Sequence, residues 1–294
     1  MENYTFIEKI GKGTHGTVYL LKSIDEGRFV VCKSITGKYK NHAYREISIL
    51  SKLSHRRVVT MIDSMVIKDS IYIMLEYINY GSVESMIEFF IKCNIRPTSS
   101  LGWNLLSQMS DALYYLHSKK IIHRDIKPSN ILISRFYVRE KEYLEFKLCD
   151  FSLSTKCEDY IEDGHMVGTP FYMAPEVVER SKYNHSIDIW GLGCCLLELM
   201  NLKKPFKGED RKELFKNILT QNPQDEISWE DSTLELMVRK CMEKNNRINA
   251  KIVAKHEKSR LHLAVLELRI KESRIEELEK RLKHIERRTG LKTE

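Results

Sequence analysis

The sequence predicts an α+β protein with two lobes, a small β-rich lobe over about residues 4–76 and a larger helical lobe over about residues 82–256. Three observations support this. Before Gly81, short runs rich in β-branched and aromatic residues alternate with glycines, which is typical of strands. After Gly81, apolar residues recur at three-and-four spacing, which is typical of helices. The 294 residues, 42% of them hydrophobic, are enough to bury a sizeable core.

The same patterns predict the elements in chain order. Strands are expected in YTFIEKI (4–10), TVYLLKSI (17–24), RFVVCKSI (28–35) and IYIMLEYI (71–78). Helices are expected in VESMIEFFIK (83–92), the run 100–120, IDIWGLGCCLLELMN (187–201) and KELFKNILTQ (212–221). The change from strand-like to helical runs places the boundary between the lobes near residues 76–82.

Composition disfavours several classes of protein. The seven cysteines form no CxxC pair, which disfavours a zinc site and a disulfide framework. No apolar run approaches the ~18 residues of a membrane span, so a cytoplasmic or nuclear protein with no membrane partner is expected. The net charge of +7 divides into 35 − 33 = +2 for residues 1–250 and 13 − 8 = +5 for residues 251–294. Basic and aromatic residues do not interleave on one face, so no nucleic-acid partner is expected.

Gly11, Gly13 and Gly16 lie between the first two predicted strands. Glycine allows backbone N–H groups to approach phosphate oxygens closely. A dinucleotide site would place a helix after this motif, whereas TVYLL predicts a strand there, so a dinucleotide fold is disfavoured. On this motif alone, an ordinary glycine-rich hairpin turn remains an equal alternative.

Asp150 lies in the short apolar run LCDFSL, where a buried carboxylate needs a partner. Upstream, Lys33 ends an apolar strand, and HRDIKPSN (123–130) is unusually dense in polar residues. GTPFYMAPE (168–176) and DIWGLG (188–193) follow LCDFSL. In this order and spacing the motifs resemble the signature set of eukaryotic protein kinases over residues 4–256, with GTPFYMAPE through KKPFKG most similar to the NIMA-related (NEK) serine/threonine kinases.

The resemblance implies a bilobal protein kinase fold that uses ATP and Mg²⁺ to phosphorylate serine or threonine in a protein substrate. In that case Asp150 and Asn130 bind Mg²⁺, Asp125 accepts the substrate proton, and Lys127 steadies the γ-phosphate. The nucleotide site implied by the family consists of Ile10, Gly11, Gly13, Gly16, Val18, Val31, Lys33, Glu76, Ile78 and Leu132. The resemblance further implies a small-lobe helix in YREISILSKL (44–53), whose Glu46 forms an ion pair with Lys33. It also implies an ion pair of Glu176 with Arg247, and support of the catalytic loop (residues 123–130) by Asp188. A role in cell-cycle or microtubule-linked regulation is also implied, so association with the cytoskeleton is left open.

The chain departs from the family pattern at several positions. Ser152 replaces the glycine of the D-F-G tripeptide, Val31 replaces an alanine, and Lys33 is only 13 residues from Glu46. These departures motivate an alternative, a catalytically weak pseudokinase that acts as a scaffold through its coiled coil. The chain between Asn130 and Asp150 is also longer than is usual in the family, and RFYVREKEYLEF (135–146) is expected to form an extended hairpin there. Residues 157–167 contain no serine or threonine, so a phosphate opposite Arg124 is not available there. We hypothesise that a carboxylate of this segment (Glu158, Asp159, Glu162 or Asp163) replaces the phosphate, or that dimerisation sets activity.

Residues 259–289 are predicted to form a helix that follows the kinase domain. Leu261, Leu268, Ile275 and Leu282 recur every seven residues, and Ala264, Leu278 and Ile285 take the complementary positions of a coiled-coil seam, which only Lys271 interrupts. A homodimer through residues 261–285 is therefore expected. In a parallel pair, Arg274 with Glu279 and Arg281 with Glu286 would attract, whereas Glu267 with Glu272 would repel. An amphipathic helix that folds back on its own kinase domain remains the alternative.

Overall fold

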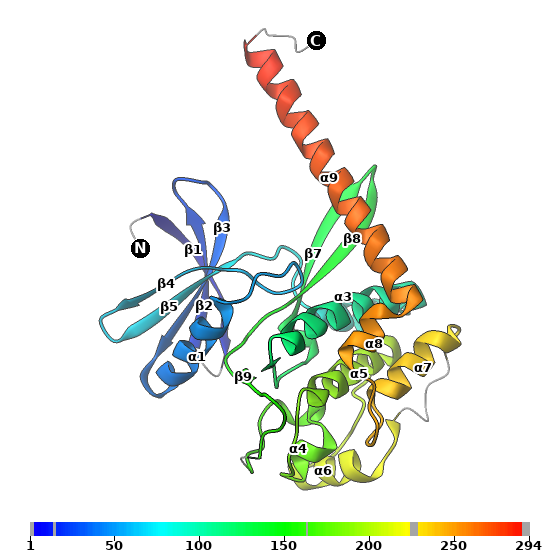
Figure 1. The fold of residues 1–294 in the computed structure, drawn as a ribbon. Coiled ribbons are helices and arrows are strands. Elements are labelled where there is room, and N and C mark those ends of the chain that lie inside the picture. Colours follow the sequence, from blue (N-terminus) through cyan, green and yellow to red (C-terminus); the bar gives the residue numbers. More distant parts are fainter. Residues whose placement is uncertain (1–2, 14–15, 163, 224–228, 290–294) are drawn as a thin grey trace.

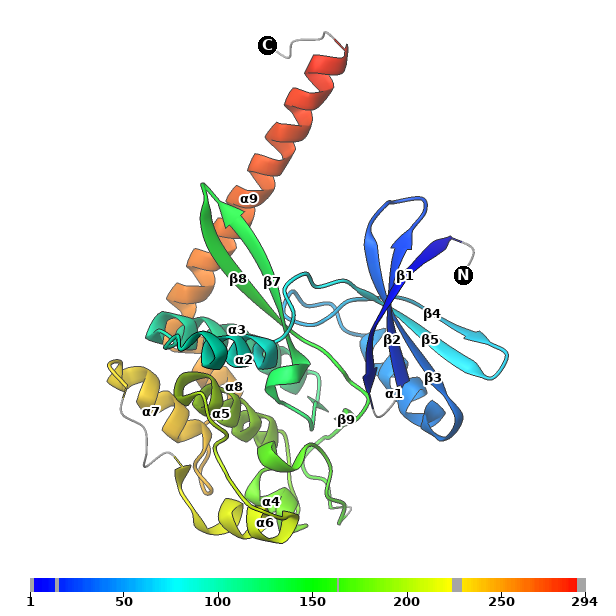
Figure 2. The same ribbon diagram turned by 180° about the vertical axis from the view of Figure 1, so that it is seen from behind.

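The computed structural model describes residues 3–13, 16–162, 164–223 and 229–289. Two lobes and a long C-terminal helix are evident in Figures 1 and 2. The small lobe holds β1–β5 and α1, and the large lobe holds the helices from α2 onward. The predicted bilobal α+β organisation is therefore confirmed.

The small lobe is a five-stranded antiparallel sheet in the order β1-β2-β3-β5-β4. Its strands are β1 (Tyr4–Gly13), β2 (Gly16–Ser23), β3 (Phe29–Thr36), β4 (Met61–Ile67) and β5 (Ser70–Glu76). After β3, one 3₁₀ turn at Gly37–Tyr39 leads directly into α1 (Lys40–Leu50). Because this connection is so short, α1 begins beside the end of the strand that carries Lys33. Its inner face buries Ala43, Glu46, Ile49 and Leu50.

The large lobe is built around α5 (Ser186–Asn201), which is mostly apolar and is buried from Ile187 to Leu199. The other helices are α2 (Val83–Cys93), α3 (Ser99–Ser118), α4 (Pro175–Val178), α6 (Arg211–Thr220), α7 (Ser232–Cys241) and α8 (Ala250–Lys255). Short strands β6 (Ile121–Ile122) and β9 (Thr155–Lys156) pair with each other. They frame the two loops that carry HRDIKPSN and LCDFSL.

A long hairpin connects these two loops. Strands β7 (Ile131–Val138) and β8 (Lys141–Leu148) pair along their whole length, which confirms the hairpin predicted for residues 135–146. At its tip Arg139 and Glu140 both adopt positive φ, of 47° and 66°, as a two-residue turn that matches the strand twist requires. The hairpin projects from the large lobe beside the C-terminal helix (Figure 1).

Helix α9 (Glu257–Thr289) is 33 residues long and confirms the helix predicted after the kinase domain. Its first turns pack on the large lobe and on the β7–β8 hairpin, and there Ser259 and Leu266 are buried. The rest of α9 extends beyond the hairpin, as both views show. In the described part of the chain, no helix has the length and apolar character needed to cross a lipid bilayer.

Candidate active site

Lys33 lies where the two lobes meet and contacts two carboxylates. Its Nζ is 2.7 Å from Oε2 of Glu46 on α1 and 2.9 Å from Oδ1 of Asp150 in the large lobe. The Lys33 and Glu46 side chains are buried, whereas that of Asp150 is partly exposed. Burial alone would raise the pKa of Asp150, but the Lys33 ammonium holds the pKa of that carboxyl well below its usual range. Asp150 is therefore ionised at neutral pH.

In the tripeptide Asp150–Phe151–Ser152, Asp150 has the unusual backbone conformation and Ser152 does not. The φ of Asp150 is +60°, in the left-handed region, while Ser152 is not among the residues with positive φ. A Cβ at position 152 is consequently compatible with this conformation. The backbone N–H of Ser152 donates to Oδ1 of Asp150 at 3.4 Å, so the serine also helps to hold the carboxylate.

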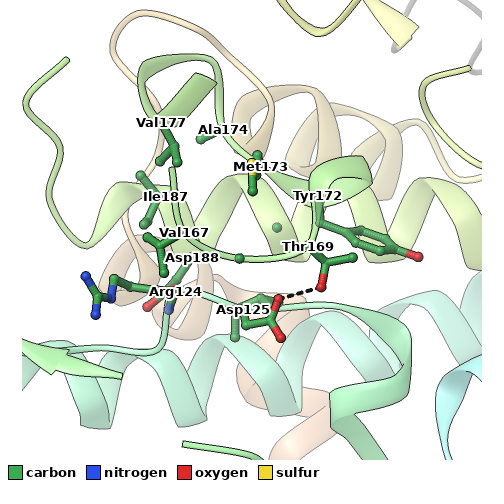
Figure 3. A pocket seen from close by; sticks show the side chains of 13 residues that line it. Arg124, Asp125, Val167, Thr169, Tyr172, Met173, Ala174, Val177, Ile187 and Asp188 are labelled. Carbon is green, nitrogen blue, oxygen red and sulfur yellow. Dashed lines mark hydrogen bonds between the residues drawn. The ribbon is translucent and has the colours of Figure 1, made fainter. Parts of the chain in front are cut away.

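Asp125 is held by three donors, two from its own loop and one from the segment after Gly168. Its Oδ1 accepts from Thr169 Oγ1 at 2.8 Å, and its Oδ2 contacts Lys127 Nζ at 2.7 Å and Asn130 Nδ2 at 3.1 Å. Lys127 also donates to Thr169 Oγ1 at 2.8 Å. Figure 3 shows the Asp125–Thr169 hydrogen bond at the edge of a pocket that Arg124, Val167 and Tyr172 also line. Thr169 was not predicted as a site residue, although its place directly after Gly168 in the GTP motif was a usable signal.

Buried Asp188 at the start of α5 fixes the backbone of the catalytic loop. One carboxylate oxygen accepts from the N–H of Arg124 at 2.9 Å, and the other accepts from the N–H of His123 at 2.9 Å and contacts His117 Nε2 at 3.0 Å. This is the geometry that the expected supporting role of Asp188 requires. His117, in the last turn of α3, was not foreseen from the sequence.

The residues assigned to nucleotide binding lie on β1, β2, β3, β5, β7 and the segment after β5. In the sheet, Gly11 pairs with Val18, Val18 with Lys33, and Leu20 with Val31, so the glycine motif is adjacent to Lys33. Gly16 needs to be glycine, because a Cβ there would lie 2.3 Å from the carbonyl oxygen of Ser34.

Glu76 ends β5 and joins the lobes through its side chain. Its carboxylate accepts from the N–H of Thr60 at 2.8 Å and contacts Lys147 Nζ at 2.8 and 2.9 Å. Ile78 follows in the connection, and Leu132 on β7 bridges to Ser82 just beyond it. Of the expected adenine-binding residues, Glu76 and Ile78 thus lie at the connection between the lobes, and Leu132 lies beside it.

The oxygens near Asp150 fit a hard divalent cation. The side-chain nitrogen of Asn130 donates to the backbone oxygen of Asp125 at 2.9 Å and to its carboxylate, which leaves the amide oxygen of Asn130 as a ligand. The backbone oxygen of Asn130 accepts from the N–H of Cys149, so Asn130 and Asp150 are held close together. Carboxylate and amide oxygens, supplemented by phosphate and water, are the ligands that Mg²⁺ prefers.

Arg124, opposite the segment without serine or threonine, bonds to two neighbours. Its Nε donates to the Leu153 carbonyl at 2.7 Å and its Nη1 donates to the Tyr183 hydroxyl at 3.1 Å. The segment itself is tied to the large lobe by two backbone hydrogen bonds between Ile161 and Tyr183, of 2.8 and 3.0 Å. Asp163, one of the carboxylates proposed to replace a phosphate, lies outside the described residues.

The expected ion pair between Glu176 and Arg247 is present. Arg247 Nη1 is 2.7 Å from Oε1 of Glu176 and 3.0 Å from the backbone oxygen of Ser186 at the start of α5. This contact joins the end of the GTPFYMAPE motif to the helix that positions Asp188.

Comparisons with known proteins agree with this geometry. A sequence model of the family described as "Protein kinase domain" matches residues 4–265, nine residues beyond the expected domain end at 256. "Probable serine/threonine-protein kinase nek2" of Dictyostelium discoideum is 32% identical over 231 residues, which are 74% of this chain and 53% of that protein. "Serine/threonine-protein kinase Nek5" of Mus musculus is 34% identical over 71% of this chain and 32% of its own length. "MAP3K epsilon protein kinase 1" of Brassica napus is 33% identical over 83% of this chain and 19% of its own length. The chain thus spans about half or less of these relatives.

Proposed function

Because the chain belongs to the protein kinase family and is similar to serine/threonine kinases of the Nek group, we propose that it transfers the γ-phosphoryl group of ATP to serine or threonine hydroxyls of proteins. One observation carries the proposal: Lys33 contacts Glu46 and Asp150 at once, at 2.7 and 2.9 Å. This joins a strand and a helix of the small lobe to the candidate metal ligand of the large lobe.

In this proposal the chain's main task is alignment, since phosphoryl transfer needs little covalent participation by the protein. Lys33 contacts the nucleotide phosphates, and Glu46 holds its ammonium in place. Asp125 accepts the proton of the attacking hydroxyl as that oxygen bonds to phosphorus and the bond to ADP breaks. Lys127 neutralises charge on the transferred group beside Asp125.

Asp150 and Asn130 are the proposed Mg²⁺ ligands. Bound Mg²⁺ supplies positive charge that stabilises the phosphate oxygens as the phosphoryl group moves. Lys33 and Asp125 hold the two ligands in place for this role: Lys33 bonds to the Asp150 carboxylate, and Asp125 orients the Asn130 amide.

Phosphate transfer from radiolabelled Mg-ATP to a casein-like protein tests the proposal. The wild-type chain is expected to be active, Asp125→Asn to lose activity by at least about 10²-fold, and the exposed turn variant Asp25→Asn to match the wild type. Absence of transfer in the wild type, together with retained binding of partner proteins, would instead support the pseudokinase scaffold.

We further propose that α9 pairs with α9 of a second copy through its exposed apolar stripe. The stripe comprises Leu261, Leu268, Ile275, Leu278 and Leu282, each between 45% and 61% exposed. It follows the seven-residue spacing of the sequence and faces away from the kinase domain, whose contacts use another face of α9. Charge complementarity along the pair would come from Arg and Glu residues that flank the stripe.

Sedimentation equilibrium tests this pairing. Ile275→Lys is expected to shift the protein towards monomer, whereas Glu276→Lys, off the stripe on the same helix, is expected to leave the association unchanged. A wild-type chain that is monomeric at high micromolar concentration would refute the pairing.

A role in cell-cycle or microtubule-linked regulation, in the cytoplasm or nucleus, completes the proposal. Its support is the similarity of residues 168–208 to the NIMA-related kinases. Cells that express Asp125→Asn in place of the wild-type chain are expected to show altered division or microtubule arrays. Normal division and normal arrays would remove this part of the proposal.

A further inference from the structure

A cluster of four charged side chains joins α9 to β8 and to the loop between α1 and β4. Glu267 on α9 uses both carboxylate oxygens, one 2.9 Å from Nη1 of Arg56 and the other 2.8 Å from Nη2 of Arg57. The same two arginines bind Oε1 of Glu145 on β8, at 2.7 Å from Arg56 and 2.5 Å from Arg57. We refer to these four residues as the arginine clamp.

The arginine clamp is buried at its centre. The Arg57 side chain is 1% exposed and that of Glu145 is 11% exposed, whereas Arg56 and Glu267 are 38% and 42% exposed. With two positive and two negative charges the cluster is neutral. If Glu267 lost its charge, the guanidinium groups of Arg56 and Arg57 would share the single carboxylate of Glu145, and that of Arg57 is buried.

The loop that carries the two arginines connects α1 to β4, and it is bonded to the strand that leads to Asp150. The carbonyl of Arg57 accepts from the N–H of Leu148 at 2.8 Å, and the carbonyl of Leu148 accepts from the N–H of Val59 at 2.9 Å. Leu148 is only two residues before Asp150. At its other end the loop follows the helix that carries Glu46.

The loop also reaches the connection between the lobes. Thr60 accepts a backbone hydrogen bond from the N–H of Glu76 at 3.0 Å, and its own N–H donates to the Glu76 carboxylate. Residues 57–60 therefore contact both the strand before Asp150 and the end of β5. A displacement of this loop would be transmitted to the Lys33–Glu46–Asp150 contacts.

We propose that Glu267 is a positioning residue for phosphoryl transfer: through Arg56 and Arg57, α9 holds the loop between α1 and β4 in the arrangement that aligns Glu46 and Asp150 around Lys33. The inference rests on the proposed function. It assigns a role to the chain beyond the matched kinase family region, which ends at residue 265, two residues before Glu267. Figures 1 and 2 show α9 running beside the β7–β8 hairpin, at the place where this contact forms.

The test compares Glu267→Gln with Glu272→Gln, whose carboxylate pairs only with Arg269 of its own helix among the described residues. Glu267→Gln is expected to lower kcat about three- to tenfold, with KM for ATP within about twofold of the wild type, because the lost alignment affects the transition state more than nucleotide binding. Glu272→Gln is expected to match the wild type. Glu267→Asp, which keeps the charge on a shorter side chain, is expected to recover part of the lost kcat.

Amide hydrogen exchange without nucleotide provides a second readout that does not depend on activity. In Glu267→Gln, residues 56–60 and 146–150 are expected to exchange about tenfold faster than in Glu272→Gln, while α5 keeps its protection. Equal exchange in both variants would overturn the inference, and so would faster exchange that includes α5, because it would indicate global destabilisation. A wild type without phosphate transfer would refute the proposed function, whereas the exchange measurement would still decide whether α9 holds this loop.

Discussion

Gly13 and Gly16 belong to one glycine motif, but the structure predicts opposite outcomes when each is replaced by alanine. A Cβ on Gly16 would lie 2.3 Å from the backbone oxygen of Ser34 and 3.0 Å from a side-chain carbon of Ile35. A Cβ on Gly13 meets no atom within 4 Å, and the φ of Gly13 is not positive. Gly13→Ala is therefore a matched control for Gly16→Ala.

The expected magnitude follows from the contact. Since real Cβ atoms essentially never approach closer than 3.0 Å, β2 must move from β3 by at least 3.0 − 2.3 = 0.7 Å. The movement disrupts the pairing of Thr17 with Ser34, and two weakened backbone hydrogen bonds cost about 2 kcal/mol. Alanine restricts the unfolded chain and offsets about 0.5 kcal/mol of this. The free energy of unfolding should fall by about 1.5 kcal/mol for Gly16→Ala, and change by less than about 0.5 kcal/mol for Gly13→Ala.

Urea denaturation followed by tryptophan fluorescence, at fixed pH and without nucleotide, measures both values. Equal losses in the two variants would refute the reasoning, because the steric difference would then have no energetic effect. A neutral Gly16→Ala would refute it as well.

Three further outcomes are expected. Glu46→Gln replaces the carboxylate 2.7 Å from the Lys33 ammonium with a neutral amide, so kcat in a steady-state assay should fall about tenfold to hundredfold, and an unchanged kcat would contradict the assigned ion pair. Ser152→Gly should lower the free energy of unfolding by about 0.5–1 kcal/mol through backbone entropy with kcat within about twofold, and a tenfold gain in kcat would show that the serine restrains activity. Burial lowers the pKa of His262, and the nearby Lys258 ammonium lowers it further. The part of the stability that depends on neutral His262 is therefore present above about pH 6.5, the usual pKa of histidine, and is lost as pH falls. His262→Gln should therefore show a smaller loss of unfolding free energy than the wild type between about pH 7 and about pH 5.5, and identical pH profiles would contradict this.

Short-range patterns were sufficient to predict the fold. The change from strand-like runs to three-and-four spacing placed both lobes. The hairpin in RFYVREKEYLEF was expected from the extra length between Asn130 and Asp150, and its turn uses Arg139 and Glu140 rather than glycine. Lys33 and Glu46 are 13 residues apart, and this short spacing made their contact the weakest expectation. The structure accommodates it because α1 follows β3 after one 3₁₀ turn.

Contacts between residues distant in the sequence were not accessible in this way. Glu267 was interpreted only as a charge that flanks a coiled-coil seam and would repel Glu272, but it binds Arg56 and Arg57, more than 200 residues away. Periodicity identifies which residues of a helix share a face, but it cannot indicate what lies against that face. The prediction of a helix that either dimerises or folds back was thus incomplete, since α9 packs on the kinase domain through one face and exposes the predicted stripe on another.

The central claim is that Asp150, held ionised by Lys33, binds the metal that accompanies ATP. The most direct measurement is the Mg²⁺ dependence of ATP affinity by titration calorimetry for the wild type and for Asp150→Asn. The account predicts that Mg²⁺ strengthens ATP binding to the wild type and has little effect on binding to Asp150→Asn. An equal Mg²⁺ dependence in the two proteins would contradict it.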